Sequence, residues 1–347
     1  MLVAALPVVL AVLPAQGPST QPAVADRPEH LRRYKLTSLV LEPRQEDTGA
    51  FDSWRVECPM VIRWQDRWLM FYSAITRTGG LDDSTIGVAV SDDLVHWRDR
   101  RQVLRRGPEG AFDHGGISGP FVWGERDTLK MIYIGFPRLG YETRPGRHGL
   151  ATSKDGIQWT KAEFNPVHDP GPKGSWNDEC LYKTFIMKHD GRYWMFYNAY
   201  GTQDHCEQIG LAFSDDLHRW TQHPENPVLR RGDPLRDRDH RIIGDPWILK
   251  NGDTWEMYYF AFDGQHAREC LATSKDLLHW TKSLLNPIMD VGPAGSYDAV
   301  HCHKPCIILH QGVHYHFFTA VGTKGEKKDY RGIGLATSRR LPRCDYR

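Results

Sequence analysis

Two acidic residues occupy nearly equivalent places in short, similar segments of the sequence. Glu57 begins the segment Glu-Cys-Pro, and Asp245 lies in the segment Gly-Asp-Pro. A pair of carboxyl groups can perform acid–base chemistry when burial or a negative neighbour keeps one of them protonated. A nearby cation keeps the other ionised, and Arg55, Arg241 and Lys304 are the candidates for that cation. The pair Glu57 and Asp245 is therefore the first candidate catalytic site.

Other residues could carry chemistry too. Asp178 and Glu179 form a competing acidic pair, of which only one would face a given side of a regular strand. His301 and His303 share one face of another predicted strand. Together with His114 or His240 they could hold an axial metal ion, or they could donate hydrogen bonds to a ligand or a carboxylate. We expect no cofactor, with the axial metal as the alternative.

The elements that position these residues are repeats. The phrase Gly-Leu-Ala-Thr-Ser-Lys-Asp-Gly-Ile-Gln-Trp at 149–159 has related copies elsewhere in the chain. These copies lie at 87–97, 210–220, 271–280 and, truncated, 334–341. A repeat of about 60 residues is typical of propellers and related arrays. We interpret the Ser-x-Asp-x-x-x-Trp phrase as a turn in which Ser and Asp hydrogen-bond the backbone and Trp packs between units.

A second phrase lies between the copies of the first. It consists of a short strand around a Pro, a turn such as Asp190-Gly191, and an aromatic strand. Its five copies lie at 57–74, 118–136, 182–200, 244–262 and 303–321. The sequence therefore predicts an all-β fold, a five-bladed β-propeller with four-stranded blades. A strand near residues 34–42 would complete the last blade.

The repeats also separate scaffold from site, because a residue that recurs in every blade is structural. Five such residues lie seven positions before the Pro-equivalent position and favour a capping role. They are Asp52, Asp113, Asn177, Asp239 and Asp298. Glu57 and Asp245 do not recur. They would face the propeller axis, which is where a ligand pocket is expected.

Composition limits the class of protein. The net charge of +1 gives no field that favours nucleic acid or an acidic membrane, so we expect neither as a partner. An apolar run, Met1–Leu13, and Ala23-Val24-Ala25 predict a signal peptide over residues 1–25 and a secreted or periplasmic domain over 26–347. Seven Cys without a C-x-x-C pair make a structural zinc site improbable and leave one or two disulfides open.

At this point a resemblance becomes specific. The five repeats, with their Ser-x-Asp-x-x-x-Trp turns and Glu-Cys-Pro and Gly-Asp-Pro strands, resemble the five-bladed propeller glycosidases of families 43, 32, 117 and 130 over residues 35–341. The resemblance implies that Glu57 is the general acid and Asp245 a base, nucleophile or substrate-binding carboxylate. The blade order departs from the family pattern, and His303-Lys304 fill the middle position where the pattern has Asp.

The resemblance implies a secreted, exo-acting glycoside hydrolase that uses paired carboxylates. The alternatives are a glycoside phosphorylase and a non-catalytic glycan-binding propeller. A carbohydrate partner is expected in each case. The candidate substrate-binding residues are Arg55, Trp54, His114, Tyr182, Arg241, His301, His303 and Lys304. Trp176 is a further candidate stacking surface.

Overall fold

The computed structural model describes residues 22–232, 239–325 and 327–347. Three four-stranded antiparallel sheets follow one another along the chain. The first consists of β2 (Arg55–Trp64), β3 (Arg67–Thr78), β4 (Leu81–Ser91) and β5 (Arg98–Leu104). The second consists of β6 (Gly116–Glu125), β7 (Thr128–Phe136), β8 (Arg147–Ser153) and β9 (Thr160–Lys161). The third consists of β10 (Cys180–His189), β11 (Arg192–Gly201), β12 (Cys206–Ser214) and β13 (Thr221–Gln222).

The remaining strands form one eight-stranded sheet. Its first part is β14 (Ile242–Asn251), β15 (Thr254–Phe262), β16 (Ala267–Ser274) and β17 (Thr281–Lys282). Its second part is β18 (His301–His310), β19 (Val313–Lys324), β20 (Lys327–Thr337) and β1 (Tyr34–Lys35). A single parallel residue pair, Ala267 with His301, joins the two parts. Because β1 pairs with β20, the predicted closing strand is confirmed, although it spans only two residues.

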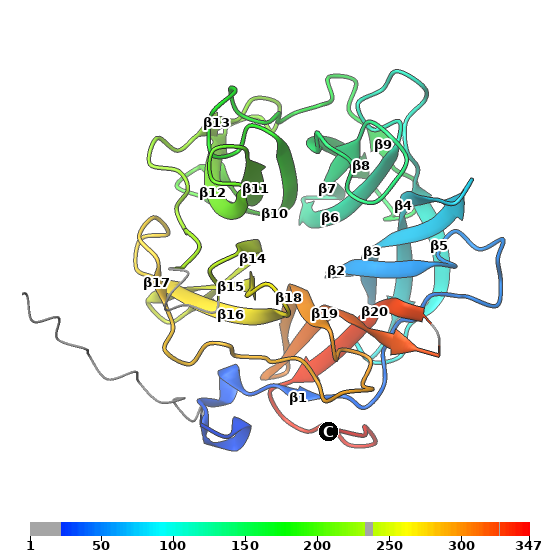
Figure 1. The fold of residues 1–347 in the computed structure, drawn as a ribbon, viewed down its shortest axis with the longest axis vertical. Helices are drawn as coiled ribbons and strands as arrows, with labels where there is room; N and C mark the ends of the chain where they lie inside the picture. Colours follow the sequence, from blue (N-terminus) through cyan, green and yellow to red (C-terminus); the bar gives the residue numbers. More distant parts are fainter. Residues whose placement is uncertain (1–21, 233–238, 326) are drawn as a thin grey trace, which may run out of the picture.

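The sheets surround a common centre, with the first strand of each repeat innermost (Figure 1). β2 contacts β6, β6 contacts β10, β10 contacts β14, β14 contacts β18, and β18 contacts β2. Two short 3-10 helices, η1 (Val24–Asp26) and η2 (Glu29–Leu31), precede β1, and the described residues contain no α-helix. The prediction of an all-β fold of four-stranded sheets is confirmed.

The repeated turn is a scaffold element. In the second sheet, the Asp155 carboxylate accepts hydrogen bonds from the backbone N–H groups of Ile157 and Gln158, both at 2.8 Å. The Trp159 ring packs edge-on against Phe71 of the first sheet. The same pair of backbone hydrogen bonds recurs at Asp93, Asp216 and Asp276. The predicted interpretation of this phrase is confirmed.

The recurring Asp and Asn residues are buried and tie each loop to the second strand of its own repeat. The hydroxyls of Tyr72 and Tyr133 donate to Asp52 and Asp113. The Tyr259 hydroxyl donates to Asp239 in the same way, whereas in the third repeat the Asn177 side-chain amide donates to the Tyr197 hydroxyl. In the last repeat Phe318 replaces the Tyr, and Asp298 binds Lys35 and Arg347 instead.

Three further expectations concern the whole chain. All seven Cys thiols are free, so neither of the disulfides left open by the sequence is present. Residues 1–21, most of the predicted signal peptide, lie outside the described residues. Within the described residues, no helix is both long and apolar enough to cross a membrane.

Candidate active site

A β-bulge interrupts each inner strand at the position before the repeated Pro, which is replaced by Thr184 in the third repeat. Cys58, Asp245 and Lys304 adopt φ values of 56°, 53° and 64°, a region that non-Gly residues seldom occupy. The following Pro has no N–H to contribute to the ladder, which suits it to a bulge. A bulge bends the strand and changes the direction of its side chains. The repeated Pro therefore marks where each inner strand presents a side chain to the centre.

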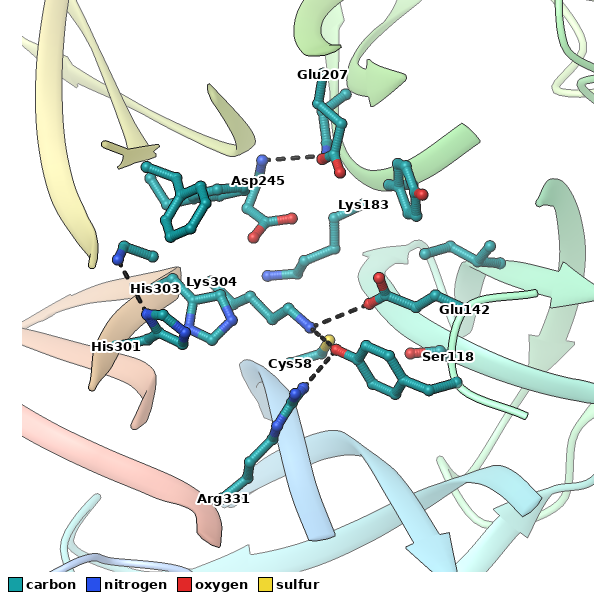
Figure 2. Close-up of a pocket in the computed structure, with 17 residues that line it drawn as sticks. Cys58, Ser118, Glu142, Lys183, Glu207, Asp245, His301, His303, Lys304 and Arg331 are labelled. Atoms are coloured by element: carbon teal, nitrogen blue, oxygen red, sulfur yellow. Dashed lines mark hydrogen bonds and ion pairs between the residues drawn. The ribbon is translucent and has the colours of Figure 1, made fainter. Parts of the chain in front are cut away.

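These side chains line a pocket of about 200 Å³ at the centre of the molecule (Figure 2). Its charged and polar lining comes from all the repeats. It comprises Cys58, Ser118, Tyr141, Glu142, Tyr182, Lys183, Asn198, Glu207, Asp245, His301, His303, Lys304 and Arg331. The structure thus brings together five predicted residues, namely Asp245, Tyr182, His301, His303 and Lys304.

Glu57 lies directly behind this lining and is 1% exposed. Its carboxylate accepts hydrogen bonds from Lys304 Nζ at 2.6 Å, Arg331 Nη1 at 3.2 Å and Tyr141 Oη at 3.2 Å. Burial by itself would raise the pKa of Glu57, but the charges of Lys304 and Arg331 outweigh it and hold that pKa below its usual range. An ionised, cation-bound carboxylate cannot donate a proton, so these surroundings oppose the general-acid role that the sequence suggested for Glu57.

Glu207 has the opposite surroundings. Burial and the nearby charges of Glu142 and Asp245 raise its pKa to about 8, against a smaller opposing effect of the Asn198 hydrogen bond. Glu207 is therefore mostly protonated at neutral pH. Burial also raises the pKa of Asp245, to about 6, although Lys183 and Lys304 oppose the effect. The pocket thus contains carboxyl groups in different protonation states, which acid–base catalysis requires.

Glu142 supplies the third carboxyl group of the pocket wall. It lies between β7 and β8 with φ of 47°, an unfavourable conformation for Glu that often accompanies functional sites. Its carboxylate is 3.5 Å from Lys304 Nζ, and its side chain is 29% exposed. Glu142 is therefore an ion-paired carboxylate within reach of solvent and of a ligand.

Two buried groups of opposite charge remain without a charged partner among the described residues. Asp245 Oδ2 has no hydrogen-bond partner there, although Asp245 is only 3% exposed. Lys183 is 5% exposed, and its ammonium donates one long hydrogen bond, 3.4 Å, to the carbonyl of Pro305. Both side chains point into the pocket (Figure 2). Buried polar groups are rarely left unpaired, so these two are available to a polar ligand.

Comparison with known proteins agrees with this geometry. Residues 53–226, half of the chain, match the glycosyl hydrolases family 32 N-terminal domain. The chain belongs to this family. It is a glycosidase, and solved structures of families 43, 117 and 130 share its fold, with TM-scores between 0.63 and 0.67 at 14–15% identity. The resemblance inferred from the sequence is confirmed.

Three individual proteins are more similar in sequence. BT0996, solved in a complex with RGII, is 29% identical with a TM-score of 0.72, over 89% of this chain and 92% of that one. An uncharacterized protein of Mycobacterium tuberculosis is 23% identical over 74% of this chain and 84% of its own length. A 1,2-beta-oligomannan phosphorylase of a Thermoanaerobacter species is 28% identical over 56% of this chain and 58% of its own length.

Several predicted residues lie outside the pocket. Arg55 is held between Asp82 and Asp329, at 2.6 and 2.5 Å. The ring of Trp54 is covered by Lys327 at 3.7 Å and by Arg77 and Arg55, so its faces are not free to stack on a sugar.

The competing acidic pair also lies away from the pocket lining. Asp178 accepts hydrogen bonds from Gly174 N and from Thr202, and Glu179 pairs with Arg144 at 2.8 Å. His114, Arg241 and Trp176 do not line the pocket either. Trp176 packs on Tyr197.

Sequence reasoning missed eight of the charged and polar lining residues, namely Cys58, Ser118, Tyr141, Glu142, Lys183, Asn198, Glu207 and Arg331. Two of them had a usable signal. Glu207 and Arg331 each lie three positions before the repeated Gly of the third strand, where the other repeats have Ser84, Gly146 and Ala267. Tyr141 and Glu142 had none, because they lie in the loop between β7 and β8, which is longer than the equivalent loops of the other repeats.

His301 and His303 lie side by side in the pocket, with ring centroids 5.9 Å apart. The backbone N–H of Ala267 donates to Nδ1 of His301, and Nδ1 of His303 pairs with the carbonyl of Thr319. Among the described residues, no three or more His, Cys, Asp or Glu side chains are grouped as for a metal ion. The axial metal remains a prediction that nothing tests.

Proposed function

We propose that this chain is an exo-acting glycoside hydrolase that cleaves a terminal glycosidic bond in the central pocket. The observation that carries the proposal is one pocket with two carboxyl groups in opposite surroundings: Glu207, whose pKa is raised to about 8 by burial and by the charges of Glu142 and Asp245, and Glu142, whose carboxylate is paired with Lys304. Glycoside hydrolysis needs one carboxyl group in each state, on the two sides of the scissile bond. A small central pocket, as opposed to a long groove, suits a terminal sugar.

Glu207 takes the role of general acid. Its protonated carboxyl group donates a proton to the glycosidic oxygen as the bond to the leaving group breaks. The apolar wall of Phe260 and the negative charge of Asp245 favour the protonated form. This role replaces the one that the sequence suggested for Glu57, whose carboxylate is held by Lys304 and Arg331.

Glu142 takes the role of base or nucleophile, because its carboxylate is ion-paired and faces the pocket. Asp245 keeps the substrate-binding role that its Gly-Asp-Pro strand suggested. Its unpaired Oδ2 is a ready acceptor for a sugar hydroxyl, and the ammonium of Lys183, with its single long hydrogen bond, is a ready donor. Tyr182 and His303 complete the polar wall.

The proposal also includes the number of blades and the export of the protein. The single residue pair between β16 and β18 supports a division of the eight-stranded sheet into two blades, which makes five in all. The apolar segment Met1–Leu13 supports export. An exported enzyme with this pocket would release one sugar from an external oligosaccharide or polysaccharide.

The test is sugar release from a panel of 4-nitrophenyl glycosides and oligosaccharides, including RGII because BT0996 was solved in that complex. Wild type is compared with Glu207→Gln, Glu142→Gln and Asp245→Asn, each checked for folding by circular dichroism. Turnover that both Glu variants lose supports the proposal. Turnover that needs inorganic phosphate favours a phosphorylase, and tight binding without turnover favours a glycan-binding propeller.

A further inference from the structure

A chain of seven charged groups of alternating sign runs from Asp82 on β4 to the pocket. Each member contacts the next within 3.5 Å. In order, the members are Asp82, Arg55, Asp329, Arg331, Glu57, Lys304 and Glu142. They come from β4, β2, β20, β18 and the loop between β7 and β8. Of the seven, Glu142, Lys304 and Arg331 line the pocket, and Glu142 is the terminal member.

Lys304 is the last cation of this chain and is 6% exposed. Its ammonium donates to Glu57 at 2.6 Å, to Tyr141 Oη at 3.3 Å and to Glu142 at 3.5 Å, and these acceptors match its three hydrogens. Tyr141 is fixed in turn by Arg331 Nη1 at 2.5 Å and by Glu57. The loop that contains Glu142 is therefore held across the pocket by contacts with β2, β18 and β20 (Figure 2).

We propose that Lys304 is a positioning residue that keeps Glu142 ionised and directed into the pocket, with Glu57 as the buried counter-ion that fixes Lys304. This inference rests on the proposed function, because it assigns a role around the carboxylate of that reaction. It explains why Glu57 is buried behind the lining and why Arg55, outside the pocket, is linked to the pocket residue Arg331 through Asp329.

The electrostatic effect of removing the Lys304 charge depends on the charged and titratable groups that face it. These are Glu57, Cys58, Tyr141, Glu142, Lys183, Glu207, Asp245, His303 and Arg331. Glu142 lies close enough to two other carboxyl groups, Glu207 and Asp245, for its charge to raise the pKa of both. Removal of the adjacent cation would raise the pKa of a carboxylate by about 1–3 units.

The sign of the effect on rate is fixed by the role of Glu142. An ionised base or nucleophile is lost as the pH falls through its pKa, so a higher pKa moves the acid limb of the rate profile to higher pH. Lys304→Met is therefore expected to move the acid limb of kcat/KM upward by about 1 pH unit or more. The loss of rate would be about tenfold or greater at pH 5 and smaller at pH 7.5.

The experiment measures kcat/KM from pH 4 to 9 with the 4-nitrophenyl glycoside that wild type turns over. Lys304→Arg keeps the charge and should restore the acid limb even if its rate is low. Lys183→Met is the matched control, since it removes another buried pocket lysine, whose ammonium bonds to the carbonyl of Pro305 and not to Glu142. It can weaken binding, and because the charge of Lys183 also opposes the raised pKa of Asp245, the control is evaluated in the titration of the Glu142 carboxyl group. Lys304→Gln is made in parallel in case the Met variant does not fold.

A second readout does not depend on activity. Proteins labelled with ¹³C at the Glu carboxyl carbon are titrated by NMR, and the Glu142 resonance is assigned by its absence in Glu142→Gln. A higher Glu142 pKa in Lys304→Met or Lys304→Gln, but not in Lys183→Met, supports the inference. An unchanged Glu142 pKa, or a uniform fall in rate at every pH, overturns it. Full activity of Glu142→Gln would instead overturn the proposed function, while the titration would still judge the role of Lys304.

Discussion

Two kinds of cavity occur in this molecule, and they differ in how their polar groups are paired. A peripheral cavity of about 710 Å³ next to β9 is lined by Asp113, Lys161, Asn165 and Pro166. A second cavity, of about 280 Å³, is lined by Asp239, Lys282, Asn286 and Pro287, which are the equivalent residues two repeats further along the chain. In both, the Asp binds the Lys and a Tyr hydroxyl. These cavities repeat with the scaffold and their charges are satisfied internally.

The central pocket is smaller than either, about 200 Å³, and no charged residue of its lining recurs in every repeat. The bulge position holds Cys58, Gly119, Lys183, Asp245 and Lys304 in the successive repeats. Within the part of the chain that the structure describes, Asp245 and Lys183 each lack a charged partner. Cavity size therefore does not identify the active site of this fold. The candidate site is instead the cavity whose charged residues differ between repeats and include groups without an ion-pair partner in the described residues.

The largest expected effect is at Glu207. Glu207→Gln keeps the shape of the side chain but removes the proton donor, so turnover of an oligosaccharide should fall by about 10²–10⁴-fold. Glycosides with a good leaving group, such as a dinitrophenyl group, should lose much less, because their departure needs little protonation. Steady-state rates on both substrates provide the measurement.

Glu269→Gln is the matched control for Glu207→Gln. Glu269 is also a buried Glu with a raised pKa on a third strand, but it does not line the pocket. We expect its rate to stay within a few-fold of wild type. An equal loss of turnover in both variants would show that a buried Glu outside the pocket affects the rate as much as one that lines it.

The next largest effect is expected for Asp113→Ala in the peripheral cavity next to β9, and it is an effect on stability. The change leaves Lys161 and Tyr133 without their buried acceptor, so the free energy of unfolding should fall by about 2–4 kcal/mol. Asp113→Asn should cost less, since Asn177 serves in the same position of the third sheet. Urea denaturation measures both variants. A loss of kcat/KM in the folded protein, with stability unchanged, would assign this cavity a function.

The repeats made the fold predictable from the sequence. Recurrence of the Ser-x-Asp-x-x-x-Trp turn fixed the number and order of the strands, because each copy satisfies its own backbone locally, as at Asp155. The Pro that follows Asp245 and Lys304 marked the bulges, so the positions facing the centre could be found. Both features depend on residues that are close together in the chain, so a sequence motif can identify them.

The protonation states were not predictable, since they depend on contacts between repeats. Glu57 was expected to be an acid, but Lys304 and Arg331, more than 240 residues away in sequence, hold it ionised. Glu142 lies in a loop that is longer than its equivalents in the other repeats, and the pKa of Glu207 is raised by burial and by the charges of Glu142 and Asp245 on other sheets. Contacts between charged side chains on different sheets produce no sequence pattern within a single repeat.

The alkaline limb of the wild-type rate profile sharpens the assignment of Glu207. Burial and the charges of Glu142 and Asp245 raise the pKa of Glu207 to about 8, and a general acid is active only while protonated. kcat/KM should therefore fall above pH 8, by about tenfold per pH unit. Asp245→Asn removes one of the charges that raise this pKa, so it should move the alkaline limb to lower pH. A limb that stays in place in that variant would mean that another group supplies the proton.

The smallest expected effect is at the repeated turn. Asp155→Ala removes the acceptor for two backbone N–H groups, but the turn is exposed and water can replace the carboxylate, so the free energy of unfolding should fall by only about 1 kcal/mol. The neighbouring Lys154→Ala, which breaks a fully exposed pair with Asp127, should leave the free energy of unfolding almost unchanged. Both variants should keep the wild-type kcat/KM, because neither residue lines the pocket. If Asp155→Ala lowered the rate of the folded protein at every pH, the turns would influence the centre. The periphery could then no longer be treated as scaffold alone.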